Sequence, residues 1–76
     1  MADHSEKIVS FIAENYSLSK DEILPDKTWG DLGLDSLEVV ECMMDLEKEF
    51  CLKITDEDMD GIKTVGDAIN YINNHA

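Results

Sequence analysis

Residues 35–50 of this 76-residue chain read DSLEVVECMMDLEKEF, a stretch without glycine or proline. Asp35 stands where a helix cap is expected, and Glu38 follows it at the three-residue spacing of a capping box, here in an acidic version. The apolar residues that come next recur at the three- and four-residue intervals of an α-helix. This pattern predicts a helix from Ser36 to about Phe50, and the rest of the fold is organised around it.

Projected at about 100° per residue, the predicted helix has two apolar faces and one acidic face. The first apolar face, which we expect to enter the core, contains Val39, Met43, Leu46 and Phe50. The acidic stripe on the opposite side contains Glu38, Glu41, Asp45 and Glu49. Between them lies a second apolar face, which Glu47 joins and Lys48 borders; its apolar members are Leu37, Val40 and Met44.

The second apolar face, formed by Leu37, Val40 and Met44, has two interpretations. A helix in a small bundle usually buries a narrower arc than both apolar faces together, so we expect this face to stay partly exposed. An exposed apolar strip edged with acid has the properties of a docking surface, in which the acids set orientation and association rate. Alternatively, these side chains pack against the preceding loop or the next helix, and periodicity alone leaves both interpretations open.

On the N-terminal side, apolar residues at helical spacing predict a first amphipathic helix over about residues 4–16. Ser19 and Glu22 then have capping-box spacing for a short turn, which Pro25 ends. Residues 26–35 read as a loop whose two glycines allow tight backbone turns. We expect this loop to be anchored by its large apolar side chains, which are Trp29, Leu32 and Leu34.

On the C-terminal side, two threonines are each followed three residues later by aspartate, and these pairs are Thr55 with Asp58 and Thr64 with Asp67. The first pair predicts a short helix that Gly61 stops, and the second predicts a last helix that frays at residues 73–75. No stretch has the alternation typical of a β-strand. The sequence therefore predicts an all-α fold, a small bundle of three main helices plus one short helix, in a single domain over residues 1–76.

The formal net charge of -12, from 18 acidic residues against six basic ones, bears on the choice of partner. A field of this sign repels nucleic acid and anionic membranes and attracts basic patches on other proteins. Scattered acids also serve simply to keep a surface soluble, so charge alone leaves the partner open. No apolar run reaches the roughly 18 residues that a membrane span needs. We expect a monomer that binds no nucleic acid and spans no membrane.

The cysteines and the start of the chain bear on compartment rather than on chemistry. Cys42 and Cys51 have neither metal-ligand spacing nor a C-x-x-C pattern, which indicates a reducing compartment and predicts no metal site. The first residues, MADH, have neither a signal-peptide core nor an arginine-rich transit pattern. We therefore expect a cytoplasmic protein.

Ser36 is the residue whose position calls for an explanation. It occupies the first turn of the predicted helix, where free amide groups and the helix dipole favour a phosphate. The two histidines, His4 and His75, lie at the ends of the chain, so no Ser/His/acid arrangement is available and we expect no enzymatic activity. A serine at this place often does no more than cap a helix. If Ser36 has a function, another enzyme must modify it.

Residues 32–37 read LGLDSL, a run that resembles the attachment motif of acyl carrier proteins. The likeness extends over essentially the whole chain. Trp29 occupies the position where that family commonly has phenylalanine, and the run LEKEF at residues 46–50 follows at family spacing. The stretch from Thr64 to Ile72 resembles the closing helix of the family.

The resemblance implies a specific function. A phosphopantetheinyl transferase would attach 4′-phosphopantetheine to Ser36, and the thiol of this arm would carry acyl groups as thioesters, which can tuck among the helices. Acyl-transfer and fatty-acid synthesis enzymes with basic docking patches would be the partners. The positions that face partners in the family correspond here to Asp35, Leu37, Glu38, Val40, Glu41, Met44 and Glu47.

Three departures from the family pattern bear on the pathway. Lys48 replaces a usual acid of the docking face, Leu34 replaces the commoner alanine, and Thr55 replaces a usual proline. They leave the motif intact but keep open whether the carrier serves type II fatty-acid synthesis or a specialised pathway, such as polyketide synthesis. The separate domain and the fatty-acid-like closing helix favour fatty-acid synthesis.

A competing motif lies at residues 56–67. The run DEDMDG at residues 56–61 matches the first half of an EF-hand calcium loop, and Asp67 falls at the twelfth position. Lys63, at a position that is normally apolar, and the short side chain of Asp67 argue against such a loop. Helix caps at Thr55 and Thr64 account for the same acids as first-turn residues. A third hypothesis is a purely acidic adaptor bundle in which Ser36 stays unmodified.

Overall fold

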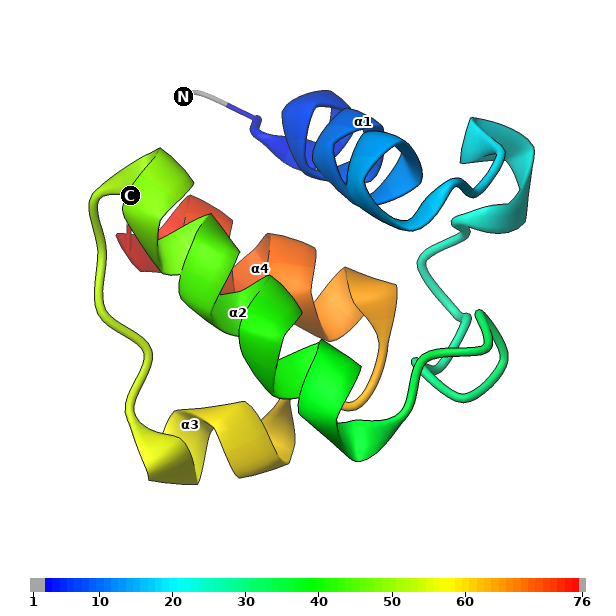
Figure 1. Cartoon of the computed structure of the whole chain (residues 1–76). Coiled ribbons are helices and arrows are strands. Elements are labelled where there is room, and N and C mark those ends of the chain that lie inside the picture. Colours follow the sequence, from blue (N-terminus) through cyan, green and yellow to red (C-terminus); the bar gives the residue numbers. More distant parts are fainter. Residues whose placement is uncertain (1–2, 76) are drawn as a thin grey trace.

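The computed structural model describes residues 3–75, and over this range the chain consists of helices and their connecting loops (Figure 1). In chain order the elements are α1 (Ser5–Tyr16), the short 3₁₀ helix η1 (Lys20–Glu22), α2 (Ser36–Phe50), α3 (Asp56–Gly61) and α4 (Val65–His75). The described part contains no strand, and an isolated antiparallel bridge joins Thr28 to Thr64. The predicted all-α bundle of three main helices and one short helix is confirmed, with η1 as an additional turn.

Helix α2 begins and ends where the sequence predicts. The Asp35 side chain accepts a hydrogen bond from the Glu38 amide at 2.8 Å, and the Glu38 carboxylate accepts one from the Asp35 amide at 3.2 Å. Both halves of the capping box are therefore formed. At the other end, Cys51 adopts the left-handed conformation at φ 53° and its amide donates to the Glu47 carbonyl.

The buried side of α2 differs slightly from the predicted core face. Met43 and Leu46 are fully buried as expected, but Val39 and Phe50 lie only partly buried at the edge of the core. Cys42, which the sequence prediction left out, is fully buried. The buried arc is thus centred on residues 42–46, which share one core cluster with the buried residues of α1 and α4.

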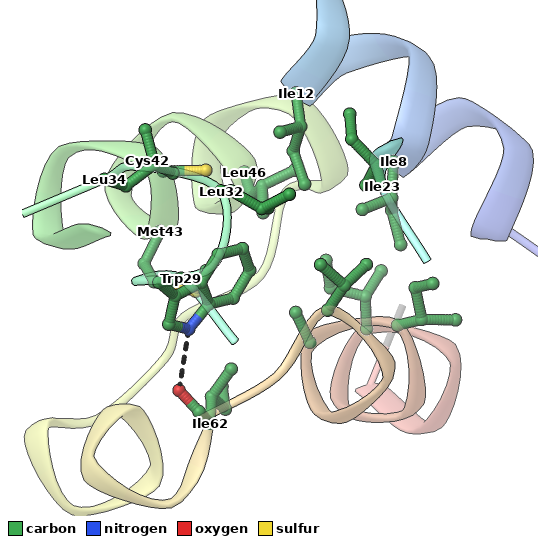
Figure 2. Packing of buried hydrophobic residues seen from close by; sticks show 14 of the residues in the cluster. Ile8, Ile12, Ile23, Trp29, Leu32, Leu34, Cys42, Met43, Leu46 and Ile62 are labelled. Atoms are coloured by element: carbon green, nitrogen blue, oxygen red, sulfur yellow. Dashed lines mark hydrogen bonds between the residues drawn. The ribbon is translucent and has the colours of Figure 1, made fainter. Parts of the chain in front are cut away.

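The core joins the three long helices to the connecting loops (Figure 2). Helix α1 contributes Ile8 and Ile12, both at 0% exposure. Helix α4 buries four residues, which are Val65, Ala68, Ile69 and Ile72. No polar or charged residue of the described chain is buried, so apolar packing dominates the stability of the core. Among the helices of residues 3–75, none has the length and apolarity that a membrane crossing requires.

The long loop between η1 and α2 is anchored as predicted, since Trp29, Leu32 and Leu34 are all buried. In addition, the Trp29 indole N–H donates to the Ile62 carbonyl at 3.0 Å, which ties the loop to the link between α3 and α4 (Figure 2). Gly33 has a φ of 81°, a conformation that side chains with a Cβ rarely adopt. The loop therefore reaches the start of α2 in a fixed conformation.

The start of α4 is held against the same loop. The amides of Val65 and Gly66 donate to the carbonyls of Lys27 and Pro25, at 3.0 Å and 2.9 Å. A Cβ at Gly66 would lie 2.9 Å from the Pro25 carbonyl oxygen, so this close approach requires glycine. Thr64 and Asp67 form the predicted reciprocal cap at 3.1 Å and 3.2 Å.

Helix α3 ends at Gly61, as predicted. Two other local predictions were wrong in detail. Ser19 accepts its hydrogen bond from Asp21 rather than from Glu22, which gives a 3₁₀ turn that ends before Pro25. Helix α4 continues to His75 without fraying, because Asn73 bonds to the backbone of His4 at 2.9 Å and to Asp3 at 3.2 Å.

Candidate functional site

Ser36 is the first residue of α2 and is exposed. Because the Asp35 carboxylate serves as the cap, the Ser36 hydroxyl is not needed for that purpose. A helix of 15 residues also presents a partial positive charge at this end, which favours an anionic group on Ser36. The local structure thus leaves the hydroxyl accessible and suits a phosphate ester at this position.

A pocket of about 460 Å³ adjoins Ser36. Its walls come from the loop around Trp29, from α2, from α3 and from the link to α4, and its apolar lining residues are Trp29, Leu34, Val39, Val40, Met59 and Ile62. Its charged lining residues are Asp35, Asp60 and Lys63. A flexible, largely apolar chain attached to Ser36 through a phosphate therefore has space to lie beside it. Another pocket, of about 440 Å³, is lined mainly by acidic side chains around Leu24 and Leu32 and does not include Ser36.

The second apolar face of α2 is exposed rather than packed. Leu37, Val40 and Met44 are 67%, 40% and 49% exposed, and with Leu24 they are the large exposed hydrophobic residues of the described chain. Nothing in the loop or in α3 covers them sufficiently to bury them. The expectation of partial exposure is confirmed, and the alternative, that these residues pack inside the bundle, is wrong. An apolar strip therefore runs along α2 from the Ser36 end.

The acids predicted to border this strip have different structural roles. Asp35 and Glu38 are held by the capping box at the start of α2. The Glu47 carboxylate accepts a hydrogen bond from the Ile54 amide at 3.0 Å, which fixes the loop between α2 and α3. Glu41 is exposed and belongs to no hydrogen bond or ion pair found within residues 3–75. Of these four acids, Glu41 is the most available for contact with a partner.

The thiol of Cys42 and the hydroxyl of Tyr16, which lie at α2, are not suited to nucleophilic chemistry. Burial, with a smaller effect of the Asp45 charge, raises the pKa of the Cys42 thiol to about 11. Burial likewise raises the pKa of Tyr16 to about 12. The Tyr16 hydroxyl donates to the Glu38 carbonyl at 3.2 Å and so joins α1 to α2. At neutral pH both groups are uncharged structural residues.

The histidines also have structural surroundings. The His4 ring packs edge-on against Phe50 with centroids 5.1 Å apart, and the His75 ring stacks on Tyr71 at 4.0 Å. Neither lines the pocket beside Ser36. Neither imidazole is therefore placed to act as a general base for Ser36.

The EF-hand hypothesis for residues 56–67 is wrong. Residues 56–61 form helix α3 in place of a metal-binding loop, and Thr55 caps it through the Asp58 amide at 3.1 Å. The Asp67 carboxylate accepts hydrogen bonds from the amides of Lys63 and Thr64, at 3.1 Å and 3.2 Å. The Asp67 carboxylate thus serves the cap of α4, the Asp58 carboxylate accepts from the Tyr71 hydroxyl, and residues 3–75 hold no group of three or more candidate ligands for a metal.

Comparisons with known proteins agree with this geometry. Residues 6–72 match the family model described as the phosphopantetheine attachment site. An acyl carrier protein from Enterococcus faecalis has a similar structure, with a TM-score of 0.79 and 33% sequence identity. That match covers 95% of this chain and 92% of the other. This chain therefore belongs to the acyl carrier proteins, which bear a phosphopantetheine group and carry acyl chains without catalysing a reaction themselves.

Proposed function

We propose that the phosphopantetheine arm is attached to Ser36 and that the chain presents the acyl groups it carries to the enzymes of type II fatty-acid synthesis. The observation that carries the assignment of Ser36 is its position. It is an exposed first-turn residue whose hydroxyl the helix cap does not use, beside a pocket of about 460 Å³. The acidic adaptor hypothesis provides no role for this pocket.

The loading step needs a transferase. The Ser36 oxygen would attack the phosphorus of coenzyme A that bears the pantetheine, the diphosphate P–O bond would break, and the adenosine bisphosphate would leave with that electron pair. The hydroxyl proton would pass to a base of the transferase. The carboxylates that line the pocket are Asp35, which is engaged in capping α2, and Asp60, which belongs to α3. Once bound, the arm supplies a thiol that holds an acyl group as a thioester.

Partner enzymes dock on the apolar strip of α2 in this proposal. Leu37, Val40 and Met44 supply the apolar contact, and the partner-facing acids Asp35, Glu38, Glu41 and Glu47 set its orientation toward basic patches. The carboxylates of Glu38 and Glu47 also accept hydrogen bonds within the chain, so Glu41 makes most of the electrostatic contact with the partner. With residues 1–76 acting as one domain and one monomer in the cytoplasm, each docking event presents one arm.

Fatty-acid synthesis is the pathway that the sequence favours, because residues 64–72 resemble the closing helix of fatty-acid carriers. The alternative is a specialised carrier, for which Lys48 on the docking side and the buried Leu34 beside the pocket are the supporting observations. Acylation of the loaded protein by purified fatty-acid and polyketide synthesis enzymes would separate the two.

The assignment of Ser36 is tested by intact mass after incubation with coenzyme A and a promiscuous transferase. The wild type should gain one phosphopantetheine, and Ser36→Ala should gain none while its helical circular dichroism stays unchanged, because Asp35 keeps the cap. Peptide mapping should place the arm on Ser36. An arm found on Ser5, Ser10, Ser17 or Ser19 would refute the assignment.

The docking surface is tested by reversing one charge. Glu41→Lys should slow association with a transferase or synthase, because it opposes a basic patch with a like charge at a cost on the order of kcal/mol. Glu14→Lys, an exposed acid on α1, is the matched control and should have a smaller effect. Equal effects of the two reversals would show that total charge, and not a located surface, governs binding.

A further inference from the structure

Lys63 has an unusual position for a basic residue of this chain. The chain has only six lysine and arginine residues against 18 acids, and Lys63 is the one basic residue among those that line the pocket beside Ser36. The other charged residues of this lining are Asp35 and Asp60. The pocket wall therefore has a negative charge of its own, which Lys63 partly offsets.

A phosphate on Ser36 would add electrostatic repulsion at this pocket wall. A phosphodiester at Ser36 adds a negative charge beside Asp35, in a chain whose net charge is already -12. The amide groups of the first turn of α2 provide partial compensation. A full positive charge close to the ester would stabilise it further, and Lys63 lines the same pocket as Ser36.

The backbone of Lys63 is held in place while its side chain is exposed. Its amide donates to the Asp67 carboxylate at 3.1 Å, and the carbonyl of the preceding residue, Ile62, accepts from the Trp29 indole at 3.0 Å. Within residues 3–75 the ion pair that forms joins Lys7 to Glu49 at 3.4 Å, and the Lys63 ammonium has no carboxylate partner there. A fixed backbone with an unengaged ammonium on a flexible stem suits a mobile anion at the pocket rim.

We propose that the Lys63 ammonium pairs with the phosphodiester of the arm on Ser36 and so holds the first part of the arm over the pocket. The inference rests on the proposed attachment to Ser36 and assigns Lys63 as a positioning residue. Because the pair is exposed, salt screens it, and a docking enzyme with a basic patch can replace Lys63 as the partner of the phosphate. The arm is then held over the pocket at rest and released on docking.

Nuclear magnetic resonance of the fully loaded protein tests this pairing. Loading should shift the side-chain ε-methylene resonances of Lys63 and leave those of Lys53, an exposed lysine outside the pocket lining, unchanged. Lys63→Ala should shift the phosphorus resonance of the arm, Lys63→Arg should largely restore it, and Lys53→Ala should leave it at the wild-type position. The change in melting temperature on loading should also be about 1–4 °C less favourable in Lys63→Ala than in the wild type.

Two outcomes would overturn the inference separately from the proposed function. If loading leaves the Lys63 resonances of the wild type unchanged, the pairing does not exist, and this comparison needs no variant to fold. If Lys63→Ala and Lys53→Ala give the same phosphorus resonance, Lys63 does not contact the phosphate. In both cases the intact mass still shows whether the arm is on Ser36, so a failed pairing is distinguished from a failed attachment.

Discussion

The two helices that line the pocket beside Ser36 are held in very different ways. Helix α2 has 15 residues, a complete capping box and three buried residues, all at 0% exposure. Helix α3 has six residues, a cap from Thr55 alone and no buried residue. It is kept in place by its flanks, where Ile54 and Ile62 are buried and Trp29 binds the Ile62 carbonyl.

The two helices therefore differ in the free energy needed to open them. Opening α2 exposes core side chains and therefore costs about as much as unfolding the domain, whereas opening α3 exposes little apolar surface. The contact of the Tyr71 hydroxyl with the Asp58 carboxylate, at 2.9 Å, adds an exposed bond of small value. The pocket thus has one wall fixed by the core and one wall that yields at lower free energy.

The largest contrast should come from truncating one side chain on each wall. Leu46→Ala removes a fully buried side chain of α2 and should lower the free energy of unfolding by about 2–5 kcal/mol. Met59→Ala, at a half-buried position of α3, should lower it by clearly less, because solvent already reaches the side chain. Urea denaturation measures both, and equal losses would contradict the distinction between the walls.

High pH should lower the free energy of unfolding through Cys42 in α2 and Tyr16, which is bonded to α2. The Cys42 pKa is raised from 9.0 to about 11 and that of Tyr16 from 10.0 to about 12, so the unfolded chain loses these protons before the folded chain does. The contribution of these two groups to the free energy of unfolding is therefore fully present below pH 9 and is lost as the pH rises toward 11. Cys42 alone accounts for roughly 2 kcal/mol at the upper end.

Thermal melts between pH 8 and 11 should show this decline. Partial burial and the contact with Asp58 also raise the pKa of Tyr71, but by less than that of Cys42, so Tyr71→Phe should reduce the decline less than Cys42→Ala does. If the decline disappears in Tyr71→Phe, the alkaline sensitivity comes from Tyr71 beside α3 and not from Cys42 in α2.

Removing the indole donor should loosen α3 selectively. Trp29→Phe deprives the Ile62 carbonyl of its partner and should cost about 1–3 kcal/mol. Hydrogen exchange should increase in α3 and in the α3–α4 link more than in α2. Uniform acceleration throughout the chain would show that α3 does not open as a separate unit.

The smallest contrast concerns the caps. Asp35→Ala and Thr55→Ala each remove a side-chain acceptor at a helix start, worth about 0.5–2 kcal/mol. The loss at Asp35 should appear in the global free energy of unfolding, whereas the loss at Thr55 should appear mainly as faster exchange within α3. The reverse assignment would mean that α3, and not α2, is coupled to the core.

Local signals made much of this architecture predictable from the sequence. The bounds of α2 follow from the Asp35–Glu38 box and the helical period, and the starts of α3 and α4 follow from their threonine caps. Likewise, the exposure of Leu37, Val40 and Met44 followed from the width of the apolar arc.

Features that depend on two distant segments were not predictable. The pocket combines residues around Trp29, Ser36 and Lys63, and no periodicity brings these together. The bond from Ile54 to Glu47 depends on the path of the loop between them, which no local pattern specifies. For the same reason the extension of α4 to His75 was missed, since it relies on the contact of Asn73 with the start of the chain.

Trp29 is the single tryptophan of the chain, and it is 6% exposed where the pocket meets the core. Its fluorescence therefore comes from one environment, shielded from water and bonded to the Ile62 carbonyl. Loss of the fold would move the emission to longer wavelength, and an acyl chain entering the pocket would change it while the fold persists. The protein thus carries an intrinsic optical probe that separates unfolding from occupancy of the pocket, without any added label.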